Sequence, residues 1–226
     1  MMKNILVIAA HSDDETLGCG GTIAAHVSAG DAVHTIFLTN GVGARDAGSA
    51  DADIQHRRIA SEAAGKMLGI KSSENFDFPD NRLDTIALLD VAQAIEPIIS
   101  EIRPEIIYTH HAHDLNIDHR ICHQAVLTAC RPQCEHPVKS IFGFEVASST
   151  EWAFSSPGFD ARYFVDISEH LTCKLDALAQ YHDEMRPSPH PRSVEAIKAL
   201  ANWRGATIGC DAAEAFSVIR QIVKVI

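Results

Sequence analysis

The sequence contains no long apolar run. No stretch approaches the roughly 20 residues that a membrane-spanning helix requires, so we expect no membrane insertion. The first apolar segment, Ile5 to Ala10, is short and leads directly into His-Ser-Asp-Asp-Glu, unlike the end of a signal peptide. These features predict a cytoplasmic protein whose first apolar segment is a strand.

Positive charge is also scarce. Lysine and arginine number 19 against 30 aspartates and glutamates, which gives a formal net charge of −11. A negative field repels phosphate backbones and anionic lipid headgroups, so binding to nucleic acid or to a membrane surface is disfavoured. We therefore expect the partner to be a small molecule.

Low-complexity tracts, internal repeats and linkers are absent. With 46% hydrophobic and 22% charged residues, the chain has enough apolar surface to form a core and is not typical of disordered proteins. A length of 226 residues suits one α/β domain. We predict a single domain over residues 1–226.

Several motifs of common enzyme classes are missing. Gly18, Gly20 and Gly21 begin a dinucleotide-binding pattern, but Ile23 stands where its third glycine is required. The chain has no Walker A sequence, and the absence of Gly-x-Ser-x-Gly disfavours a serine hydrolase. The glycines instead predict close packing of a helix against the sheet.

Cysteine is present but scattered. The six cysteines are Cys19, Cys122, Cys130, Cys134, Cys173 and Cys210. A chain of this length does not need disulfides for stability, so we expect free thiols and a reducing compartment. A structural metal site at Cys130, Cys134 and His136 would lack a fourth ligand and is disfavoured.

Hydrophobic patterning predicts strands that alternate with helices. The expected strands are 5–10, 33–39, 106–109, 140–146, 162–165 and 217–226. The expected helices are 22–28, 53–68, 84–102, 119–131, 170–181 and 194–203. This alternation predicts an α/β, Rossmann-like three-layer fold, with a mostly parallel sheet and helices on both faces. A polar loop at 41–52 is expected to cover a binding site.

Histidine is abundant, with 13 in the chain. Six of them are close together: His110, His111, His113, His119, His123 and His136. Such a density favours metal or acid–base chemistry.

Two polar clusters follow predicted strands. The first is His11-Ser12-Asp13-Asp14-Glu15, and the second runs from His110 to His119. Ligands of open α/β sheets bind beyond the carboxyl ends of the strands, so the two clusters can converge there. Helix capping is the alternative for the first cluster taken alone. A histidine, an aspartate and a distant histidine would supply the three ligands of an open catalytic metal site. Zinc is the leading candidate for the ion, and ferrous iron is an alternative.

The clusters carry a family resemblance. His11-Ser12-Asp13-Asp14-Glu15-Thr16-Leu17-Gly18 and Asn116-x-Asp118-His119 resemble the two signature motifs of the PIG-L/LmbE-like zinc N-deacetylases, HPDDE and HPDH. Later stretches, Asp80 with Leu83 and Arg204-Gly205 with Ala213-Glu214-Ala215-Phe216, resemble other recurrent parts of that family. The resemblance therefore spans nearly the whole chain.

The resemblance implies a role for each matching residue. His11, Asp14 and His119 would bind Zn²⁺, Asp13 would be the general base, and Asp118 would support the ligands. The implied reaction removes an N-acetyl group from an acetamido sugar and releases acetate and a free amine. General chemistry agrees, because zinc acidifies its water toward a pKa of about 7 and polarises a carbonyl. A carboxylate beside it can then accept the proton.

Two positions depart from the family motifs. Ser12 replaces a proline, which removes a fixed φ angle but no chemical group. Asn116 stands where the family often has a histidine that stabilises the oxyanion; an amide can donate a hydrogen bond but cannot deliver a proton. We therefore expect Asp13 to act first as base and then as acid. Three histidines are candidates to assist it: His111, His113 and His182.

Substrate contacts are predicted at Asp80, Arg57 and Arg58, although a solvated helix face is an equal alternative for the two arginines. The lone histidines His26, His34 and His56 are expected to be surface or hydrogen-bonded residues. Two other functions stay open: hydrolysis of another N-acyl amine by the same chemistry, and a non-catalytic module that binds nucleotides or sequesters metal ions.

Overall fold

A computed structural model describes residues 2–41, 50–133, 137–154 and 157–223. Its strands form one seven-stranded sheet in the order β3-β2-β1-β4-β5-β7-β6. The strands are β1 (Asn4–Ala9), β2 (Ala32–Thr39), β3 (Ser72–Phe78), β4 (Ile106–His110), β5 (Ser140–Phe144), β6 (Tyr163–Asp166) and β7 (Ala213–Gln221). The first five are parallel, and β7 runs antiparallel to both β5 and β6.

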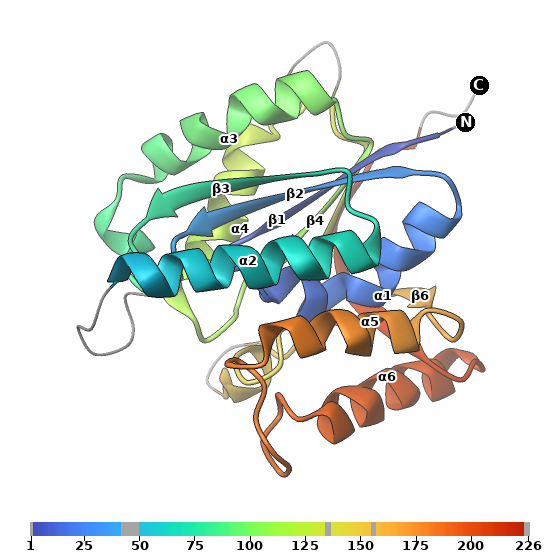
Figure 1. Ribbon diagram of the computed structural model, residues 1–226. Coiled ribbons are helices and arrows are strands. Elements are labelled where there is room, and N and C mark those ends of the chain that lie inside the picture. Colours follow the sequence, from blue (N-terminus) through green and yellow to red (C-terminus); the bar gives the residue numbers. More distant parts are fainter. Residues whose placement is uncertain (1, 42–49, 134–136, 155–156, 224–226) are drawn as a thin grey trace.

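Helices cover both faces of the sheet. They are α1 (Asp14–Ser28), α2 (Ala50–Leu68), α3 (Leu88–Ile102), α4 (Ile117–Ala129), α5 (Leu171–Leu178) and α6 (Val194–Ile208), with the 3-10 turns η1 (Leu83–Thr85), η2 (Thr150–Trp152) and η3 (Ala179–Tyr181). Figure 1 shows α3 on one side of the sheet and α1, α5 and α6 on the other. The predicted Rossmann-like α/β fold is confirmed.

Strand β1 divides the core in two. Side chains alternate along a strand, so Ile5 and Val7 face one helical layer while Leu6 and Ile8 face the other. The first core also contains residues of α1, α2 and α5, and the second contains residues of α3 and α4. Both faces of β1 are buried, which explains its continuous aliphatic sequence.

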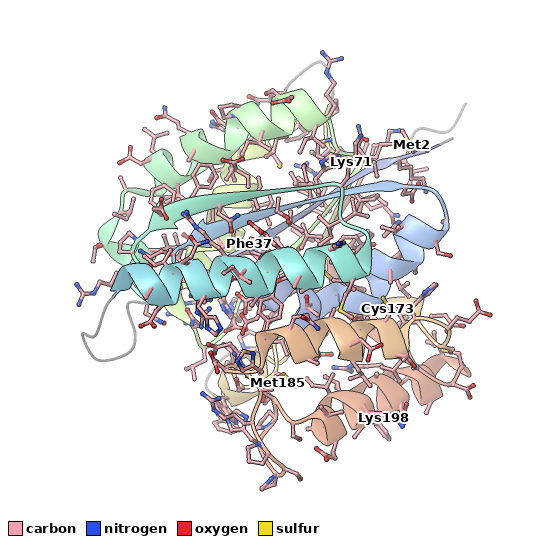
Figure 2. All side chains as sticks on the ribbon, in the orientation of Figure 1. Met2, Phe37, Lys71, Cys173, Met185 and Lys198 are labelled. Atoms are coloured by element: carbon pink, nitrogen blue, oxygen red, sulfur yellow. The ribbon has the colours of Figure 1, made fainter. Side chains whose placement is uncertain are left out.

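Large apolar side chains are buried in these cores, and charged side chains lie outside them. Phe37 of β2 is buried between the sheet and the helices, whereas Lys71 and Lys198 lie on the surface (Figure 2).

Among the described helices, none is both long and apolar enough to cross a membrane. Four of the described cysteines, Cys19, Cys122, Cys173 and Cys210, are free thiols. Cys134 and His136, and most of the predicted loop 41–52, lie outside the described residues.

Several elements differ from the sequence prediction. Helix α3 begins at Leu88 and not at 84, which lies in the turn η1, and α6 continues to Ile208 beyond its predicted end at 203. Strand β3 was not predicted, because an edge strand with the sequence Ser-Ser-Glu-Asn-Phe-Asp-Phe lacks an apolar pattern. Helix α1 begins at Asp14 and not at residue 22, because its first turn is made of the polar motif. Strand β7 begins at Ala213, earlier than predicted.

The glycines of α1 permit close packing, as the sequence predicted. A Cβ atom on Gly21 would lie 2.6 Å from Ile167 Cδ1, and one on Gly18 would overlap the ring of Phe144 in β5. Since real Cβ atoms do not approach neighbours this closely, larger residues would push α1 away from the sheet. The first turn of α1, which carries part of the first motif, would move with it.

Candidate active site

The two polar clusters meet where the strand order reverses. Strands β1 and β4 are parallel neighbours, with Ile5 opposite Ile106, while β2 and β3 lie on the far side of β1. Open α/β sheets bind ligands in the crevice at such a switch point. The first motif follows β1 and the second follows β4, so the fold brings them to one crevice.

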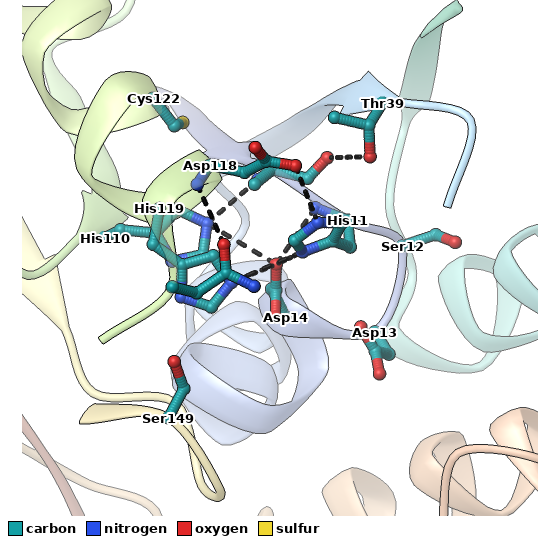
Figure 3. A network of polar contacts seen from close by, with 12 residues as sticks. His11, Ser12, Asp13, Asp14, Thr39, His110, Asp118, His119, Cys122 and Ser149 are labelled. Atoms are coloured by element: carbon teal, nitrogen blue, oxygen red, sulfur yellow. Dashed lines mark hydrogen bonds and ion pairs between the residues drawn. The ribbon is translucent and has the colours of Figure 1, made fainter. Parts of the chain in front are cut away.

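Three ligand atoms of these motifs form a small triangle. His11 Nδ1 lies 3.1 Å from Asp14 Oδ2, and His119 Nε2 lies 3.3 Å from each of these two atoms (Figure 3). In tetrahedral zinc sites with bonds of about 2.0–2.1 Å, neighbouring ligand atoms are about 3.3 Å apart. Asp14 Oδ1 is buried and has no hydrogen-bond partner among the described residues. Geometry and donor chemistry therefore fit one divalent cation.

His11 is oriented by two carboxylates on its other side. Its Nε2 lies 3.2 Å from Asp118 Oδ2 and 3.0 Å from Asp80 Oδ1. Asp118 also accepts backbone N–H hydrogen bonds from Asn81 and Leu83, at 2.6 and 2.9 Å. Because these donors already hold both oxygens of Asp118, this residue is suited to positioning the imidazole. A proton on Nε2 then leaves Nδ1 available to a metal ion.

His11, Asp80 and Asp118 themselves form a second possible ligand group. The backbone donors to Asp118 make this group less suitable for a cation than the triangle that includes Asp14.

His119 is oriented by Asp114, a residue the sequence analysis missed. Asp114 Oδ1 lies 3.1 Å from His119 Nδ1. Thr150 donates a hydrogen bond of 2.5 Å to Asp114, and Ser149 donates another. A carboxylate behind a metal-binding imidazole fixes its ring and tautomer. The available signal was an aspartate within the histidine-rich segment, five residues before His119.

The charges of the cluster complement one another. Burial would lower the pKa of His11, but the carboxylates around it, led by Asp14, hold that pKa well above the usual value. Burial would raise the pKa of Asp14, yet His119 and His11 keep it well below the usual range. The cluster therefore stabilises positive charge at its centre, where either protons or a cation can supply it.

Asp13 has an unusual backbone conformation. Its φ of 128° and ψ of −29° place it in a region that non-glycine residues rarely adopt. Glu15 accepts the Asp13 backbone N–H at 3.0 Å and is held in turn by Thr16 and Tyr181. Burial raises the pKa of Glu15 to about 7, against the effect of these hydrogen bonds. The strained residue is therefore fixed by a buried network.

The Asp13 carboxylate is held by Arg192, another residue that sequence reasoning missed. Burial raises the pKa of Asp13, and the nearby Arg192 guanidinium partly opposes that rise. Arg192 also donates hydrogen bonds to Ala147 O and Ser148 Oγ. No local pattern marks an arginine this distant in sequence as a partner of the first motif.

Helix α1 bends just behind the motif, at Cys19, whose φ is −147°. Glu214 accepts the N–H groups of Gly21 and Thr22, and Lys174 donates to Leu17 O. Lys174 and Glu214 also form a buried ion pair at 2.5 Å. These contacts satisfy backbone groups that the bend removes from the helical ladder, so they fix the direction of the first turn.

A polar cavity of about 150 Å³ opens beside His11. Its lining residues are His11, Asp13, Gly41, Arg57, Asp80, Asn81, Asn116, Glu184 and Arg192. Of the candidate substrate residues, Arg57 pairs with Glu184 at 2.5 Å, whereas Arg58 pairs with exposed Asp77 outside this lining.

The Asn116 side chain makes two contacts, one at the start of α4 and one at the cavity. Its Oδ1 accepts the Asp118 N–H at 2.8 Å and so caps α4, while its Nδ2 lies 3.3 Å from Asn81 Oδ1 at the cavity.

The three histidines expected to assist Asp13 lie outside the cavity lining. His111 is buried against His113 and Phe159. His182 lies on the surface beside His56.

Comparisons with known proteins identify the family of the chain. The family described as "PIG-L: GlcNAc-PI de-N-acetylase" matches residues 6–130. The chain is 31% identical to the uncharacterized deacetylase YaiS of Escherichia coli over 185 residues, covering 79% of this chain and 90% of YaiS. It is 30% identical to a probable N-acetyl-alpha-D-glucosaminyl L-malate deacetylase 2 of Bacillus cereus over 214 residues, covering 90% and 94% of the two chains.

The fold is shared beyond these relatives. The crystal structure of a 4-carboxy-2-hydroxymuconate hydratase from Pseudomonas putida superposes with a TM-score of 0.77 at 23% identity, covering 100% of this chain and 99% of the other. This fold therefore carries more than one reaction, and family membership rests on the sequence matches. Because the family match spans more than half of this chain, the protein belongs to the PIG-L family of de-N-acetylases, which are hydrolases of amide bonds.

Proposed function

We propose that the protein is a zinc-dependent N-deacetylase that removes the acetyl group of an acetamido sugar. The observation that carries this proposal is the triangle of His11 Nδ1, Asp14 Oδ2 and His119 Nε2, with edges of 3.1–3.3 Å, beside a polar cavity. Two imidazoles and one carboxylate are typical ligands of an open zinc site. Since all described strands belong to one sheet, we also infer that the chain works as one domain.

The family and the lining of the cavity support this substrate class. The Bacillus cereus relative is named for an N-acetylglucosaminyl substrate. The cavity presents cationic donors at Arg57 and Arg192 and carboxylate acceptors at Asp80 and Glu184. Hydroxyl groups of a sugar can both donate and accept hydrogen bonds, so this mixed lining suits a hydroxylated ligand.

The bound ion would supply Lewis acidity and an acidified water. Asp13 would accept a proton from the attacking water as the water oxygen forms a bond to the acetyl carbon. The C–N bond then breaks, and Asp13 returns the proton to the leaving nitrogen, so that acetate and a free amine result. The Asn116 amide, which lines the cavity, would donate a hydrogen bond to the developing oxyanion. Asp118 and Asp114 keep the two imidazoles aligned.

Acetate release from a panel of N-acetylated hexosamines, free and glycosidically linked, tests the proposal. N-acetyl amino acids and N-acetyl polyamines form the comparison set. We expect release from the sugars alone, lost on chelation and restored by Zn²⁺ more effectively than by Fe²⁺. Release only from the comparison set would favour an amidohydrolase of other N-acyl amines. Tight metal binding without any release would favour the non-catalytic alternative.

Two variants separate metal binding from chemistry. Asp13→Asn keeps all three ligands, so we expect it to bind one tight Zn²⁺ while losing about 10²–10⁴-fold in kcat, the usual contribution of a general base. His119→Ala removes a ligand and should lose both the tight ion and the activity. Equal loss of metal in both variants would contradict the assignment of Asp13 as a base outside the ligand set.

A further inference from the structure

A further group of side chains that could hold a metal ion lies on the surface. His56 of α2, together with His182 and Asp183 directly after η3, places one ligand atom from each residue within 4.8 Å of the others. His56 Nδ1 lies 3.2 Å from Asp183 Oδ2, and His182 Nε2 lies 3.3 Å from Asp183 Oδ1. The two imidazole rings approach edge to face, with centroids 5.4 Å apart. None of these residues lines the catalytic cavity.

The donor set suits a borderline transition metal. Imidazole nitrogen and carboxylate oxygen are common ligands of Zn²⁺ and Co²⁺. The spacings to Asp183 are close to the roughly 3.3 Å that separates neighbouring ligands in a tetrahedral site. More than half of each side chain is exposed, at 54% for His56, 65% for His182 and 56% for Asp183. Water can therefore complete the coordination, and the net charge of −11 draws cations toward the protein.

The group also lies where a bound ion would connect two segments behind the wall of the catalytic cavity. Its ligands come from two separate segments, α2 and the turn that follows η3. The residue after His56 is Arg57 and the residue after Asp183 is Glu184, and these two form the ion pair in the wall of the catalytic cavity. A small hollow lined by His56, Arg57, Tyr181 and His182 lies between the segments. A cation on the three ligands would tie these segments together behind the cavity wall.

We propose that His56, His182 and Asp183 form an accessory site for a divalent transition-metal ion, separate from the buried triangle. The site joins α2 to the turn after η3 and holds the Arg57–Glu184 wall in place. It does not depend on the deacetylase activity, because its ligands take no part in the proposed reaction.

Metal stoichiometry tests the site directly. Chelator-treated protein is titrated with Zn²⁺ in a calorimeter and with Co²⁺ by absorption spectroscopy. We expect two equivalents to bind the wild type, the second more weakly than the first. His182→Ala and His56→Ala should each bind only the tight equivalent. His113→Ala, which removes an exposed histidine outside both groups, should still bind two.

A complementary variant and a second measurement complete the test. His119→Ala should lose the tight equivalent and keep the weak one, which shows that the two ions bind independently. Zn²⁺ beyond one equivalent should raise the Tm of the wild type but not of His182→Ala, with equal Tm values for the two metal-free proteins. One equivalent in the wild type, or the same stoichiometry in the wild type and His182→Ala, overturns the accessory site.

Discussion

Arg192 Nη1 lies 2.7 Å from Asp13 Oδ2, although the two residues are 179 positions apart in the sequence. The pair joins the strained first motif to the segment that precedes α6. Asp13 is almost fully buried and the Arg192 side chain is 18% exposed, so the contact is largely shielded from water. The guanidinium therefore both fixes the direction of the carboxylate and stabilises its charged form.

Arg192→Ala should impair catalysis by Asp13 without removing the metal ligands. A carboxylate that loses its anchor moves away from the reacting water, and a displacement of about 1 Å can cost 10²-fold in rate. The guanidinium lowers the pKa of Asp13, so its removal raises that pKa. Because the base must be deprotonated, the acid limb of the pH–kcat profile should move to higher pH.

The measurement is the pH–rate profile of the two proteins together with their Zn²⁺ content. Arg162→Ala is a matched control, because Arg162 is 71% exposed and pairs only with nearby Asp160 among the described residues. An acid limb that stays in place, or moves to lower pH, would contradict the role assigned to Arg192.

Asp114→Asn should reduce the affinity for metal strongly and the free energy of unfolding only slightly. The amide keeps the size of the side chain and can still hydrogen-bond Thr150, but it does not carry the negative charge beside His119. Loss of such a supporting carboxylate typically costs 10–100-fold in metal affinity. Competition with a chromophoric chelator measures the change. Asp160→Asn, an exposed substitution, is the control, and equal affinities in the two variants would count against Asp114 as the residue that orients His119.

Arg57 and Arg58 offer a comparison between neighbours. Arg57 lines the cavity and pairs with Glu184, whereas Arg58 pairs with an exposed aspartate outside it. Arg57→Ala should remove a charge-assisted contact to the substrate, worth about 1.5–3 kcal/mol, and raise KM about 10–100-fold. Arg58→Ala should leave KM near the wild-type value. Steady-state kinetics on the best sugar of the panel, with Tm as a check on folding, decides between them.

The sequence predicted the parts of the site that lie on local motifs. The apolar strands end at 10 and 109, and polar clusters follow each of them, so both the location and the candidate ligands could be predicted from order and chemistry. The contacts of Glu214, Arg192 and Glu184 could not be predicted, because their partners are brought close only by the fold. Strand β3 was missed for a related reason: it pairs with only one neighbour, β2, in the described sheet, so its stability does not need an apolar pattern. His56 was expected to be a surface or hydrogen-bonded histidine, since nothing near it in sequence reveals His182 and Asp183.

The two roles of the Asn116 side chain, as a helix cap and as the proposed oxyanion donor, can be separated experimentally. The side chain caps α4 through Oδ1, and Nδ2 is the donor proposed for the oxyanion. Asn116→Ala removes both and should lower the free energy of unfolding by about 1 kcal/mol, the usual value of an N-cap. Asn116→Asp keeps an acceptor for the Asp118 N–H, and its charge is favourable at a helix N-terminus, so the cap should survive.

The kinetic consequences differ from the effects on stability. Neither alanine nor aspartate can donate from this position, so both variants should lose kcat by similar factors, up to about 10²–10³-fold for one oxyanion donor. Chemical denaturation and kcat are measured on the same preparations. A fall in kcat confined to Asn116→Ala would show that Asn116 acts only through the helix cap. A similar fall in both, with stability lost in only one, would separate oxyanion stabilisation from helix capping in this single side chain.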